Sequence, residues 1–422
     1  MRVQAGPWLA IVSLLALPAA SAQALLAGVV PDLPGAAEGD EAVMVGALED
    51  VSLGGWSLSD GEGAWRLPPL QLRRGEVATF TGNVSRWAAF DGRADAQWPA
   101  GTLRLANDGD DVRLLRPDGS LADSFAWGDG RAPGMDGSVR YTSPALVYRR
   151  LPAAHGGQPW TDTDSADDWR TPRMHRVGES SHPPLRLQAE GAVLYASPDS
   201  SHAVLAQAIR SARERLHLHV YDLRSPSLVD LLVEQRAAHP LLDLQVLVED
   251  RPVGQDTLER HETAWALRRI EAAGGTAWLA GSVRYAHHHL KVLVADDQVA
   301  VQSENWVPSG VPQDPTWGNR GWGVLLRGAA VADAVAAWLA ADRAAHDTAR
   351  FQLATYAPTY EEPVRRPPRA GTHQPVPPLA VARPLEVQLV LAPDHTADPR
   401  ADPVAALVRD ARREVLVQQL DV

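Results

Sequence analysis

The stretch His289-Leu290-Lys291-Val292-Leu293-Val294-Ala295-Asp296 decides how the central part of this chain folds, and Ser303-Glu304-Asn305-Trp306 follows shortly after it. Apolar residues alternate with His289 and Lys291, which predicts a strand over 289–295 that packs one face. Side chains two residues apart on a strand point to the same side. We therefore expect His289 and Lys291 to present their side chains together on the other face.

These residue types suit chemistry at phosphorus. Imidazole is a nucleophile at neutral pH without prior deprotonation, and it is an acid once protonated. A lysine supplies a compact charge for the non-bridging oxygens of a phosphoryl group, to which Ser303 and Asn305 add uncharged donors. The alternative for His289 is an ordinary histidine on a sheet. We expect Glu304 to be a surface turn residue and Trp306 to pack beneath the site.

Strand and helix patterns alternate from Leu185 onward. The expected segments are strand 192–195, helix 203–214, strand 216–221, helix 227–238, strand 244–248, helix 258–273 and strand 276–279. Strands separated by helices of this length favour an α/β domain with a mostly parallel sheet, which we expect over residues 185–362.

An internal repeat is the second informative feature. Residues 209–216 (IRSARERL) recur 199 positions later as residues 408–415 (VRDARREV), and residues 196–199 (ASPD) are echoed by residues 391–394 (LAPD). We therefore expect a Pro-rich linker over 363–384 and the incomplete start of a second copy over 385–422. The same offset would put a second His-x-Lys near position ~488, beyond the residues given. The alternative is that two amphipathic helix-strand units merely look alike.

The first residues have the pattern of a secretory signal. Arg2 precedes an apolar run, and Ala20-Ser21-Ala22 gives a small-x-small cleavage site, so we expect residues 1–22 to be removed and the protein to be secreted or displayed at the cell surface. The alternative is an uncleaved anchor, but roughly thirteen apolar residues fall short of the ~20 that span a bilayer.

Composition limits the possible partners. The 422-residue chain has a formal net charge of −12 and no cysteine. Broad, salt-driven adhesion to DNA or anionic lipid needs a surplus of Lys and Arg, so nucleic acid is a less favoured partner. The absence of cysteine excludes disulfide cross-links and is compatible with an oxidising compartment.

Short apolar alternations between turn signals predict an antiparallel β-sandwich over residues 23–135. Asp60-Gly61, Asn107-Asp108-Gly109 and Pro117-Asp118-Gly119 are the expected turns, and Trp56 and Trp127 are expected core residues. The connector 136–184 is rich in Gly, Pro and Asp. Its alternating carboxylates at 161–169 invite a calcium hypothesis, but the segment lacks the Gly and the distal Glu of an EF-hand, which favours a capped turn.

Residues 54–60 (GGWSLSD), 101–107 (GTLRLAN) and 118–123 (DGSLAD) resemble a lamin-tail domain, which implies an immunoglobulin-like sandwich. Such domains attached to secreted enzymes look like adhesion or targeting modules, so the resemblance implies a target in the cell envelope. It carries over no binding residue to this chain.

Residues 285–291 (YAHHHLK), Asp296, residues 303–306 (SENW) and residues 317–324 (WGNRGWGV) together resemble the first half of a phospholipase D superfamily enzyme. The resemblance covers about residues 185–345 and the short segment 385–422. It implies two His-x-Lys-x-x-x-x-Asp (HKD) motifs, one from each repeat or each subunit. One histidine attacks phosphorus to give a phosphohistidine, and the other protonates the departing alcohol. Water or another alcohol then takes the phosphoryl group.

Within the resemblance, His289, Lys291 and Asp296 form the motif, and Asp296 orients structure without entering the chemistry. Three features differ from the family pattern. Gln302 stands where a glycine usually precedes the serine, the interval after Asp296 is one residue short, and Gly321 occupies a place often filled by Glu.

A metal or cofactor is not expected. The triple histidine at 287–289 invites a zinc hypothesis, but adjacent residues on a strand point to opposite faces, and no acidic or Cys partner stands at ligand spacing in the sequence.

Two functions remain. The first is a secreted phosphodiesterase or phosphatidyltransferase that acts on a lipid or small phosphodiester and needs a second HKD lobe, from a missing C-terminal part or from a dimer. The alternative is a non-catalytic surface protein in which the sandwich binds and the α/β half is a degenerate scaffold.

Overall fold

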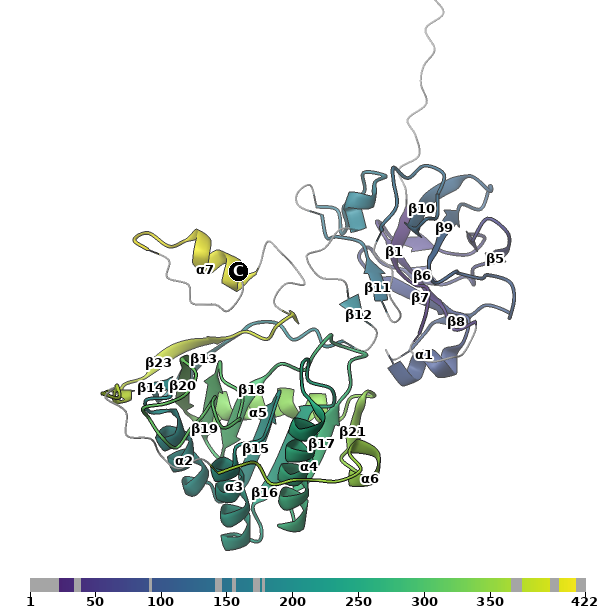
Figure 1. The fold of residues 1–422 in the computed structure, drawn as a ribbon. Helices are drawn as coiled ribbons and strands as arrows, with labels where there is room; N and C mark the ends of the chain where they lie inside the picture. The colour runs from purple at the N-terminus through teal and green to yellow at the C-terminus, as the bar shows by residue number, and fades with distance from the viewer. Residues whose placement is uncertain are drawn as a thin grey trace, which may run out of the picture.

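The computed structural model describes residues 23–33, 39–90, 93–140, 146–153, 157–169, 175–176, 179–365, 374–394 and 402–414. It shows an N-terminal unit of strands and a C-terminal unit in which helices cover a large sheet (Figure 1). The predicted signal, residues 1–22, lies outside the described residues. Among those described, no helix combines the length and the apolar character that a bilayer span requires.

The N-terminal unit contains two larger sheets that share one core. The first sheet runs in the order β12 (His175–Arg176), β11 (Leu146–Arg149), β1 (Ala24–Val30), β2 (Ala42–Ala47), β7 (Val77–Thr81) and β8 (Ala96–Gln97). The second runs in the order β10 (Leu121–Gly128), β9 (Gly109–Leu115), β4 (Ser57–Ser59) and β5 (Ala64–Arg66), and β3 (Val51–Ser52) pairs with β6 (Gln71–Leu72). Both sheets contribute to a core in which Trp56 and Trp127 are buried, as predicted. A short helix, α1 (Val84–Phe90), follows β7.

The predicted turn at Asp60-Gly61 joins β4 to β5. The Asp60 carboxylate accepts backbone N–H bonds from Glu62 at 3.0 Å and from Gly63 at 2.6 Å. Gly61 has a φ of +86°, a conformation that a side chain disfavours. Local side-chain hydrogen bonding of this kind lets a turn be predicted from sequence.

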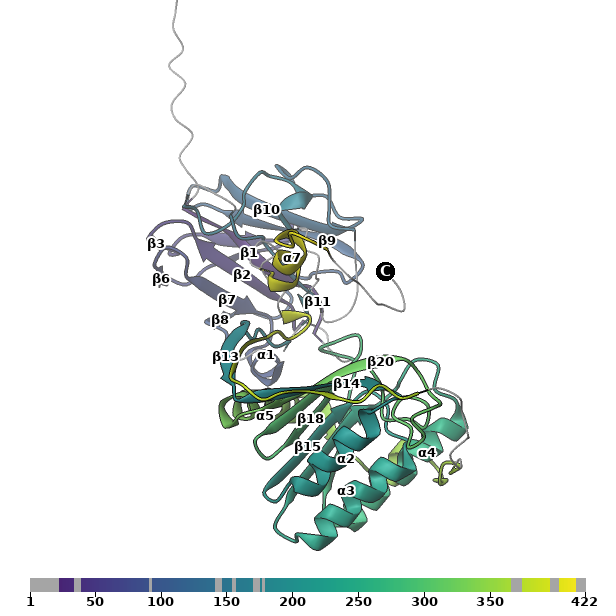
Figure 2. The same ribbon diagram turned by 90° about the vertical axis from the view of Figure 1, so that its left-hand side faces the viewer.

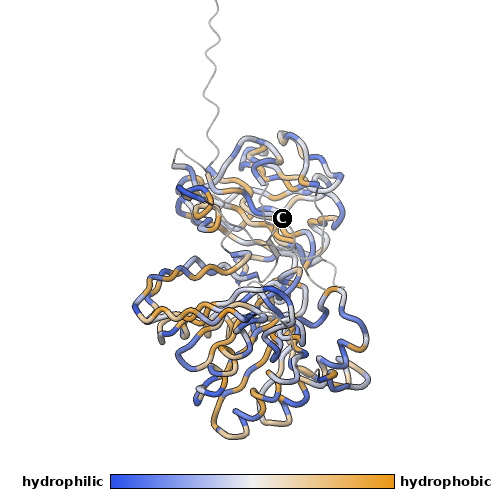
Figure 3. The backbone as a smooth tube through the Cα atoms, turned by 60° about the vertical axis from the view of Figure 1, so that its left-hand side comes forward, coloured by the Kyte–Doolittle hydropathy of each residue, from blue (hydrophilic) through white to orange (hydrophobic). Residues whose placement is uncertain are grey.

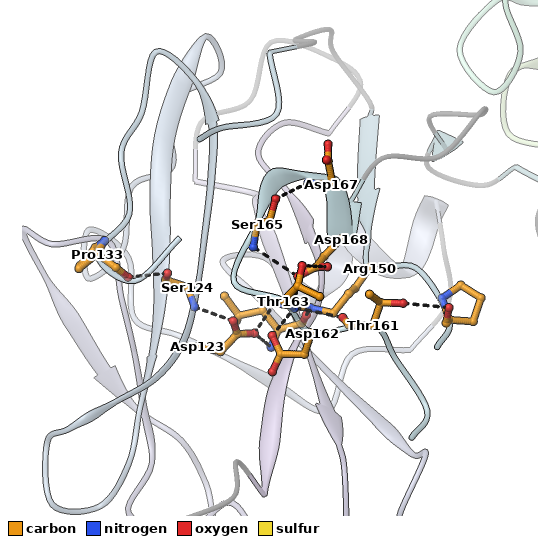
Figure 4. A network of polar contacts seen from close by, with 12 residues as sticks. Asp123, Ser124, Pro133, Arg150, Thr161, Asp162, Thr163, Ser165, Asp167 and Asp168 are labelled. Atoms are coloured by element: carbon orange, nitrogen blue, oxygen red, sulfur yellow. Dashed lines mark hydrogen bonds and ion pairs between the residues drawn. The ribbon is translucent and has the colours of Figure 1, made fainter. Parts of the chain in front are cut away.

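The acidic segment 161–169 closes the unit around an arginine (Figure 4). The buried Arg150 guanidinium donates to Asp123 at 2.6 Å and to Asp162 at 2.9 Å, while the Asp168 carboxylate accepts from the Thr163 backbone and hydroxyl, each at 2.7 Å. Burial raises the pKa of Asp123 to about 6 although Arg150 opposes the shift. Asp123, Asp162 and Asp164 lie close enough together to hold a metal ion, but Arg150 already supplies a cation there. The capped-turn prediction is confirmed.

The C-terminal unit is built on a nine-stranded sheet. Its order is β21 (Thr348–Arg350), β17 (Thr276–Ala280), β16 (Asp243–Glu249), β15 (Arg215–Val220), β18 (Lys291–Ala295), β19 (Gln298–Gln302), β20 (Gly321–Arg327), β14 (Gly191–Ser197) and β22 (Leu379–Val381). The helices are α2 (Ser201–Ser211), α3 (Pro226–Ala238), α4 (Thr257–Ala272), α5 (Ala329–Arg343), α6 (Leu353–Tyr356) and α7 (Pro403–Arg409).

The prediction of a mostly parallel sheet is wrong. Among the described strands of this sheet, β16 is parallel to β15 and to β17, and the other pairings are antiparallel. One cause is the connection after β18, where Asp296 and Asp297 alone separate it from β19. A two-residue turn can only join antiparallel strands, whereas a parallel pair needs a crossover of a dozen residues or more.

Two separate cores cover the two faces of the sheet. Helices α2, α3 and α4 lie side by side on one face, and α5 lies on the other (Figure 2). Figure 3 shows hydrophobic strands gathered inside both units and hydrophilic segments at many of the turns. The start of α4 suits a helix, since Asp256 and Glu259 form a capping box there.

The strands near the end of the chain pair reciprocally with the start of the C-terminal unit. β23 (Leu385–Leu389) is antiparallel to β13 (Leu185–Ala189), and β22 is antiparallel to β14. When residues 391–394 are aligned with their echo at 196–199, β22 corresponds to β13 and β23 to β14. The first strand of each copy therefore pairs with the second strand of the other, as two copies related by a two-fold axis would do. β22 falls within the predicted linker 363–384.

Candidate functional site

The register of the sheet brings the predicted site residues to one edge. Val220, the last residue of β15, lies opposite Lys291, the first residue of β18. Gln302, at the end of β19, lies opposite Gly323 near the start of β20. Because these pairings are antiparallel, the loops that follow β15 and β19 meet the segments that precede β18 and β20.

The strand that carries Lys291 begins later than predicted and is more deeply buried. β18 starts at Lys291 and every residue in it is buried, so the prediction of one packed and one open face is wrong for this strand. His289 lies before the strand because the backbone N–H of His288 donates to the Glu249 carboxylate at 2.7 Å rather than to a neighbouring strand. His289 is exposed and lies at this edge of the sheet, two residues before β18.

Tyr221 contacts both predicted reacting side chains. Its ring lies 4.6 Å from the His289 ring at an angle of 72°, and the Lys291 ammonium lies 5.2 Å from the Tyr221 ring centroid. The Lys291 Nζ also donates to the His289 carbonyl at 2.9 Å. The Tyr221 hydroxyl accepts the Val253 backbone N–H at 2.6 Å, which fixes the ring between the two.

Burial is the largest cause of the pKa shifts of both His289 and Lys291. Partial burial and then the nearby charges of Lys291 and His287 lower the pKa of His289, which favours neutral imidazole. Burial lowers the pKa of Lys291 to about 8, while the charges of Glu304 and Asp222 favour its ammonium form. Lys291 is the only lysine in the 422-residue chain, a signal in the composition that sequence reasoning missed. Every other cation that could serve here is an arginine or a histidine.

Ser303 and Asn305 lie in the loop after β19. The Ser303 hydroxyl accepts the Trp322 backbone N–H at 3.0 Å, which ties this loop to β20. The side-chain oxygen of Asn305 is buried and has no hydrogen-bond partner among the described residues. A buried amide oxygen without a partner is uncommon in folded proteins, and it leaves this side chain able to take a new contact.

Glu304 differs from its prediction as a surface turn residue. Its carboxylate is half-buried, and burial raises its pKa although hydrogen bonds from the side chains of Asn319 and Ser303, and the charge of Lys291, act in the other direction. The side chain folds toward the first residue of β20, where a Cβ added to Gly321 would overlap it. The burial comes from a strand that is distant in sequence, and for that reason the local pattern could not show it.

Asp296 holds the turn after β18 to the loop between α2 and β15. Its carboxylate accepts the backbone N–H groups of Arg213, Glu214 and Arg215 at 2.8, 2.9 and 3.0 Å. Its φ of +52° lies in the left-handed region that Asp tolerates better than most residues. These bonds make Asp296 a structural anchor of the turn between β18 and β19.

The other two histidines of the triplet point apart. His287 is exposed, with its Nδ1 3.9 Å from Glu249, whereas His288 is buried with its Nε2 3.1 Å from Asp342. His219, His288 and Asp342 lie close enough together to hold a metal ion. Asp342 is an acidic neighbour that α5 supplies and that the sequence did not reveal. Two guanidinium groups already occupy this cluster, because Arg343 lies 3.2 Å from His219 and Arg284 lies 3.2 Å from Asp342.

Trp306 is fully buried in the core beneath the site, as predicted. Its backbone N–H donates to the Asp222 carbonyl at 3.1 Å, and its carbonyl accepts from Arg224 and Ser225 at 2.8 Å. These bonds fix the loop that carries Ser303 and Asn305 to the end of β15. Gln302, the residue before Ser303, is held by the Tyr195 hydroxyl at 3.1 Å.

Comparison with known proteins finds similar solved structures for part of the chain. No family model matches the sequence, and no curated protein matches it. The chain is similar to Nuc of Salmonella typhimurium, a phospholipase D family member (16% identity, TM-score 0.32, 40% of this chain and 99% of Nuc). It is also similar to NucT of Helicobacter pylori (14%, 0.30, 40% of this chain and 100% of NucT) and to phosphatidylserine synthase of Haemophilus influenzae Rd KW20 (15%, 0.30, 35% of this chain and 36% of the synthase).

Proposed function

We propose that this chain is a phosphodiesterase or phosphatidyltransferase of the phospholipase D type that works through a phosphohistidine at His289. One observation carries the proposal. The exposed His289 ring and the Lys291 ammonium are gathered around Tyr221 at one sheet edge, next to the loop that bears Ser303 and Asn305. A candidate nucleophile just before β18 and the only lysine of the chain, at the first position of β18, are thereby held against one aromatic ring.

The proposed first step is attack of the neutral His289 imidazole on phosphorus. The nitrogen lone pair forms the P–N bond, the bond from phosphorus to the departing alcohol oxygen breaks, and that oxygen takes a proton. Lys291 holds the non-bridging oxygens as their charge develops, and Ser303 and Asn305 add donors. Water or a second alcohol then attacks phosphorus, which releases His289 and completes hydrolysis or transfer.

The departing oxygen needs an acid, and in this proposal the acid is a second imidazole from an equivalent lobe. The reciprocal pairing of β13 with β23 and of β14 with β22 supports such a lobe, because it is the pairing that two like copies adopt around a two-fold axis. Continuation of the second repeat or a second copy of the chain would each provide the partner motif.

The surface beside the site supports a lipid or small phosphodiester as substrate. A hollow of about 510 Å³ with a mainly apolar lining lies next to Ser303, between β14, β19 and β20. Trp322 lines it and is 61% exposed, and the Trp322 backbone N–H contacts the Ser303 hydroxyl. A net charge of −12 weighs against a polynucleotide.

The N-terminal unit fits a targeting role in the same proposal. We propose that residues 23–135 form a lamin-tail-like domain that binds a cell-envelope target, joined through the connector 136–184. The protein would be secreted or displayed at the surface after cleavage near Ala22. N-terminal sequencing of protein recovered from the culture medium is the direct check, and a first residue at Gln23 is expected.

The alternative function is a non-catalytic surface protein with a degenerate scaffold. Gln302 and Gly321 favour it, since both depart from the resembled pattern, and so does the hydrogen bond that Lys291 makes to the His289 carbonyl. The two functions differ in whether His289 becomes phosphorylated.

Hydrolysis of bis-p-nitrophenyl phosphate by separated oligomeric forms tests the proposal. We expect the monomeric chain to be inactive or nearly so, because it lacks the acid, and we expect forms with two motifs to turn the substrate over. His289→Ala should abolish that turnover. His239→Ala, which changes a partly buried residue at the end of α3, is the matched control and should keep the wild-type rate. Turnover that survives His289→Ala would reject the proposed function.

A further inference from the structure

His288 is the fixed member of the histidine triplet at 287–289. Its side chain is 3% exposed, and its Nε2 donates to the Asp342 carboxylate at 3.1 Å. Its backbone N–H donates to the Glu249 carboxylate at 2.7 Å. These partners come from α5 and from the last position of β16, and both are distant from the triplet in the sequence. His288 is therefore held by its backbone and by its ring.

Glu249 is a buried carboxylate that the steps proposed above do not use. Its side chain is 1% exposed, and burial raises its pKa, while the hydrogen bond from the His288 backbone is the largest effect in the other direction. Its second oxygen lies 3.9 Å from the His287 Nδ1. Burying a carboxylate is costly unless donors or cations compensate it. The groups that compensate Glu249 include the two residues before His289, so its stabilisation depends on the path of this segment.

His289 lies between this anchor and a second one. The Leu290 carbonyl accepts the Tyr221 backbone N–H at 3.0 Å, which continues the pairing of β15 with β18. The residues on both sides of His289 are thus bonded to neighbouring segments, while the His289 side chain itself is exposed. Because the backbone is fixed on both sides, the direction in which this side chain leaves the backbone is fixed as well.

We propose that Glu249 is a positioning residue that acts through His288 to set the direction of the His289 side chain. Asp342 holds the His288 ring in the same arrangement. The consequence for catalysis rests on the proposed function, but the anchoring of the segment does not. An imidazole that attacks phosphorus must be held near the reacting geometry, and a small displacement slows the reaction strongly. Loss of the Glu249 anchor should therefore slow the attack.

Hydrogen exchange of the His288 amide in the full-length chain tests the anchor without substrate. Fragmentation mass spectrometry of the peptide that spans residues 285–291 resolves this amide. In the wild type it should exchange more slowly than the amide of the exposed His287. Glu249→Leu keeps a side chain of similar size and removes the acceptor, so exchange at His288 should become at least about tenfold faster. Glu249→Gln keeps an oxygen that can accept the same N–H, and it should restore slow exchange.

Gln235→Leu is the matched control for stability. Gln235 is buried on α3 and its Nε2 donates to the Ala212 carbonyl at 2.6 Å, so this change also removes a buried contact to the backbone. The end of α3 precedes the start of β16, whereas Glu249 ends β16, and the control should leave the His288 amide slow.

Three results would overturn the proposal. The first is equal exchange at His287 and His288 in the wild type, which needs no variant to fold. The second is the same exchange at His288 in Glu249→Leu as in Gln235→Leu. The third is exchange in Glu249→Gln as fast as in Glu249→Leu.

Failure of the anchor is distinguishable from failure of the proposed function. Exchange needs no substrate, so a protected His288 amide without phosphohistidine would reject the proposed function and keep the anchor. In an active form, Glu249→Leu should lower the single-turnover rate constant by about tenfold or more and leave KM within a few-fold of wild type. A general loss of folded protein would instead lower the fraction of protein that reacts. A wild-type rate constant in Glu249→Leu would overturn the positioning role.

Discussion

The Tyr221 ring stands edge-on to the His289 imidazole, with 4.6 Å between the ring centroids. Tyr221 directly follows β15 and His289 precedes β18, so this contact joins two segments that are 68 positions apart in the sequence. His289 is exposed and lies outside regular structure, and Tyr221 is the aromatic residue that limits its orientation. The Tyr221 hydroxyl is itself held by the Val253 backbone N–H at 2.6 Å.

Removal of the Tyr221 ring should therefore reduce the rate of attack more than removal of its hydroxyl. In an active form, Tyr221→Ala should slow phosphohistidine formation by about 10–100-fold, the scale expected when a reacting group loses its orientation. Tyr221→Phe keeps the ring and should stay within a few-fold of wild type, at a stability cost of about 1 kcal/mol for the lost hydrogen bond. Single-turnover rates measure the difference, and equal rates for the two variants would remove Tyr221 from a positioning role.

The two perturbed groups predict a bell-shaped pH–rate profile. The pKa of His289 is lowered, so the nucleophilic neutral form persists below the ordinary histidine range and the acid limb should lie below pH ~6.5. Lys291 must be charged, and with a pKa of about 8 its contribution fades as pH rises through that value. Lys291→Arg should remove the part of the alkaline limb that Lys291 contributes, because arginine stays charged, and keep the part that comes from the second imidazole. Lys291→Ala should raise the barrier by about 2–4 kcal/mol across the range. An alkaline limb that survives Lys291→Arg unchanged would assign it to another group.

Asp296 should matter for stability more than for chemistry. Asp296→Ala removes the acceptor of three backbone N–H groups at a left-handed position, and we expect the free energy of unfolding to fall by about 2–4 kcal/mol. Asp296→Asn keeps one acceptor oxygen and tolerates the same φ. Its free energy of unfolding should therefore fall between those of the wild type and Asp296→Ala. Urea unfolding measures both changes. Wild-type midpoints for both variants would contradict the assignment of Asp296 as a structural anchor.

Arg150 should be the most sensitive charged residue of the N-terminal unit. Arg150→Met leaves the buried Asp123 and Asp168 carboxylates without their cation, and we expect a loss of about 3–5 kcal/mol. Arg186→Met is the matched control, because its ion pair with Glu386 is exposed and such pairs contribute about 0.5 kcal/mol or less. Thermal unfolding of the two variants separates these effects. Similar midpoints would show that Arg150 is not the structural cation of this cluster.

The elements that local periodicity controls were predictable from the sequence. The alternating strands and helices between residues 192 and 279 lie within a few residues of their expected bounds, because an amphipathic pattern is fixed by neighbours along the chain. The turn at Asp60-Gly61 was predictable because the Asp60 carboxylate binds backbone groups next to it in the sequence. Whether strands pair parallel or antiparallel was not predictable, because it depends on which strands pair after the turn at Asp296 and Asp297.

The candidate site was predictable as a set of residues and not as an arrangement. The motif spacing identified His289, Lys291 and Asp296, and β18, β19 and β20 bring Ser303 to the same edge. The roles of Tyr221 and Glu304 depend on contacts with distant segments, namely His289 and Gly321, which no local pattern contains. The single lysine was visible in the sequence, and it is the composition signal that would have strengthened the site prediction.

Detection of phosphate on one histidine tests the central claim most directly. A form that contains two motifs is incubated with a phosphodiester, trapped at low pH and digested, and the peptide that spans residues 287–291 is analysed by fragmentation mass spectrometry. We expect His289 to gain the mass of the phosphoryl group with its one remaining ester substituent, and we expect no such gain in this peptide from His289→Ala. Turnover without phosphate on either motif histidine would contradict covalent catalysis, and phosphate on His287 or His288 would contradict the choice of nucleophile.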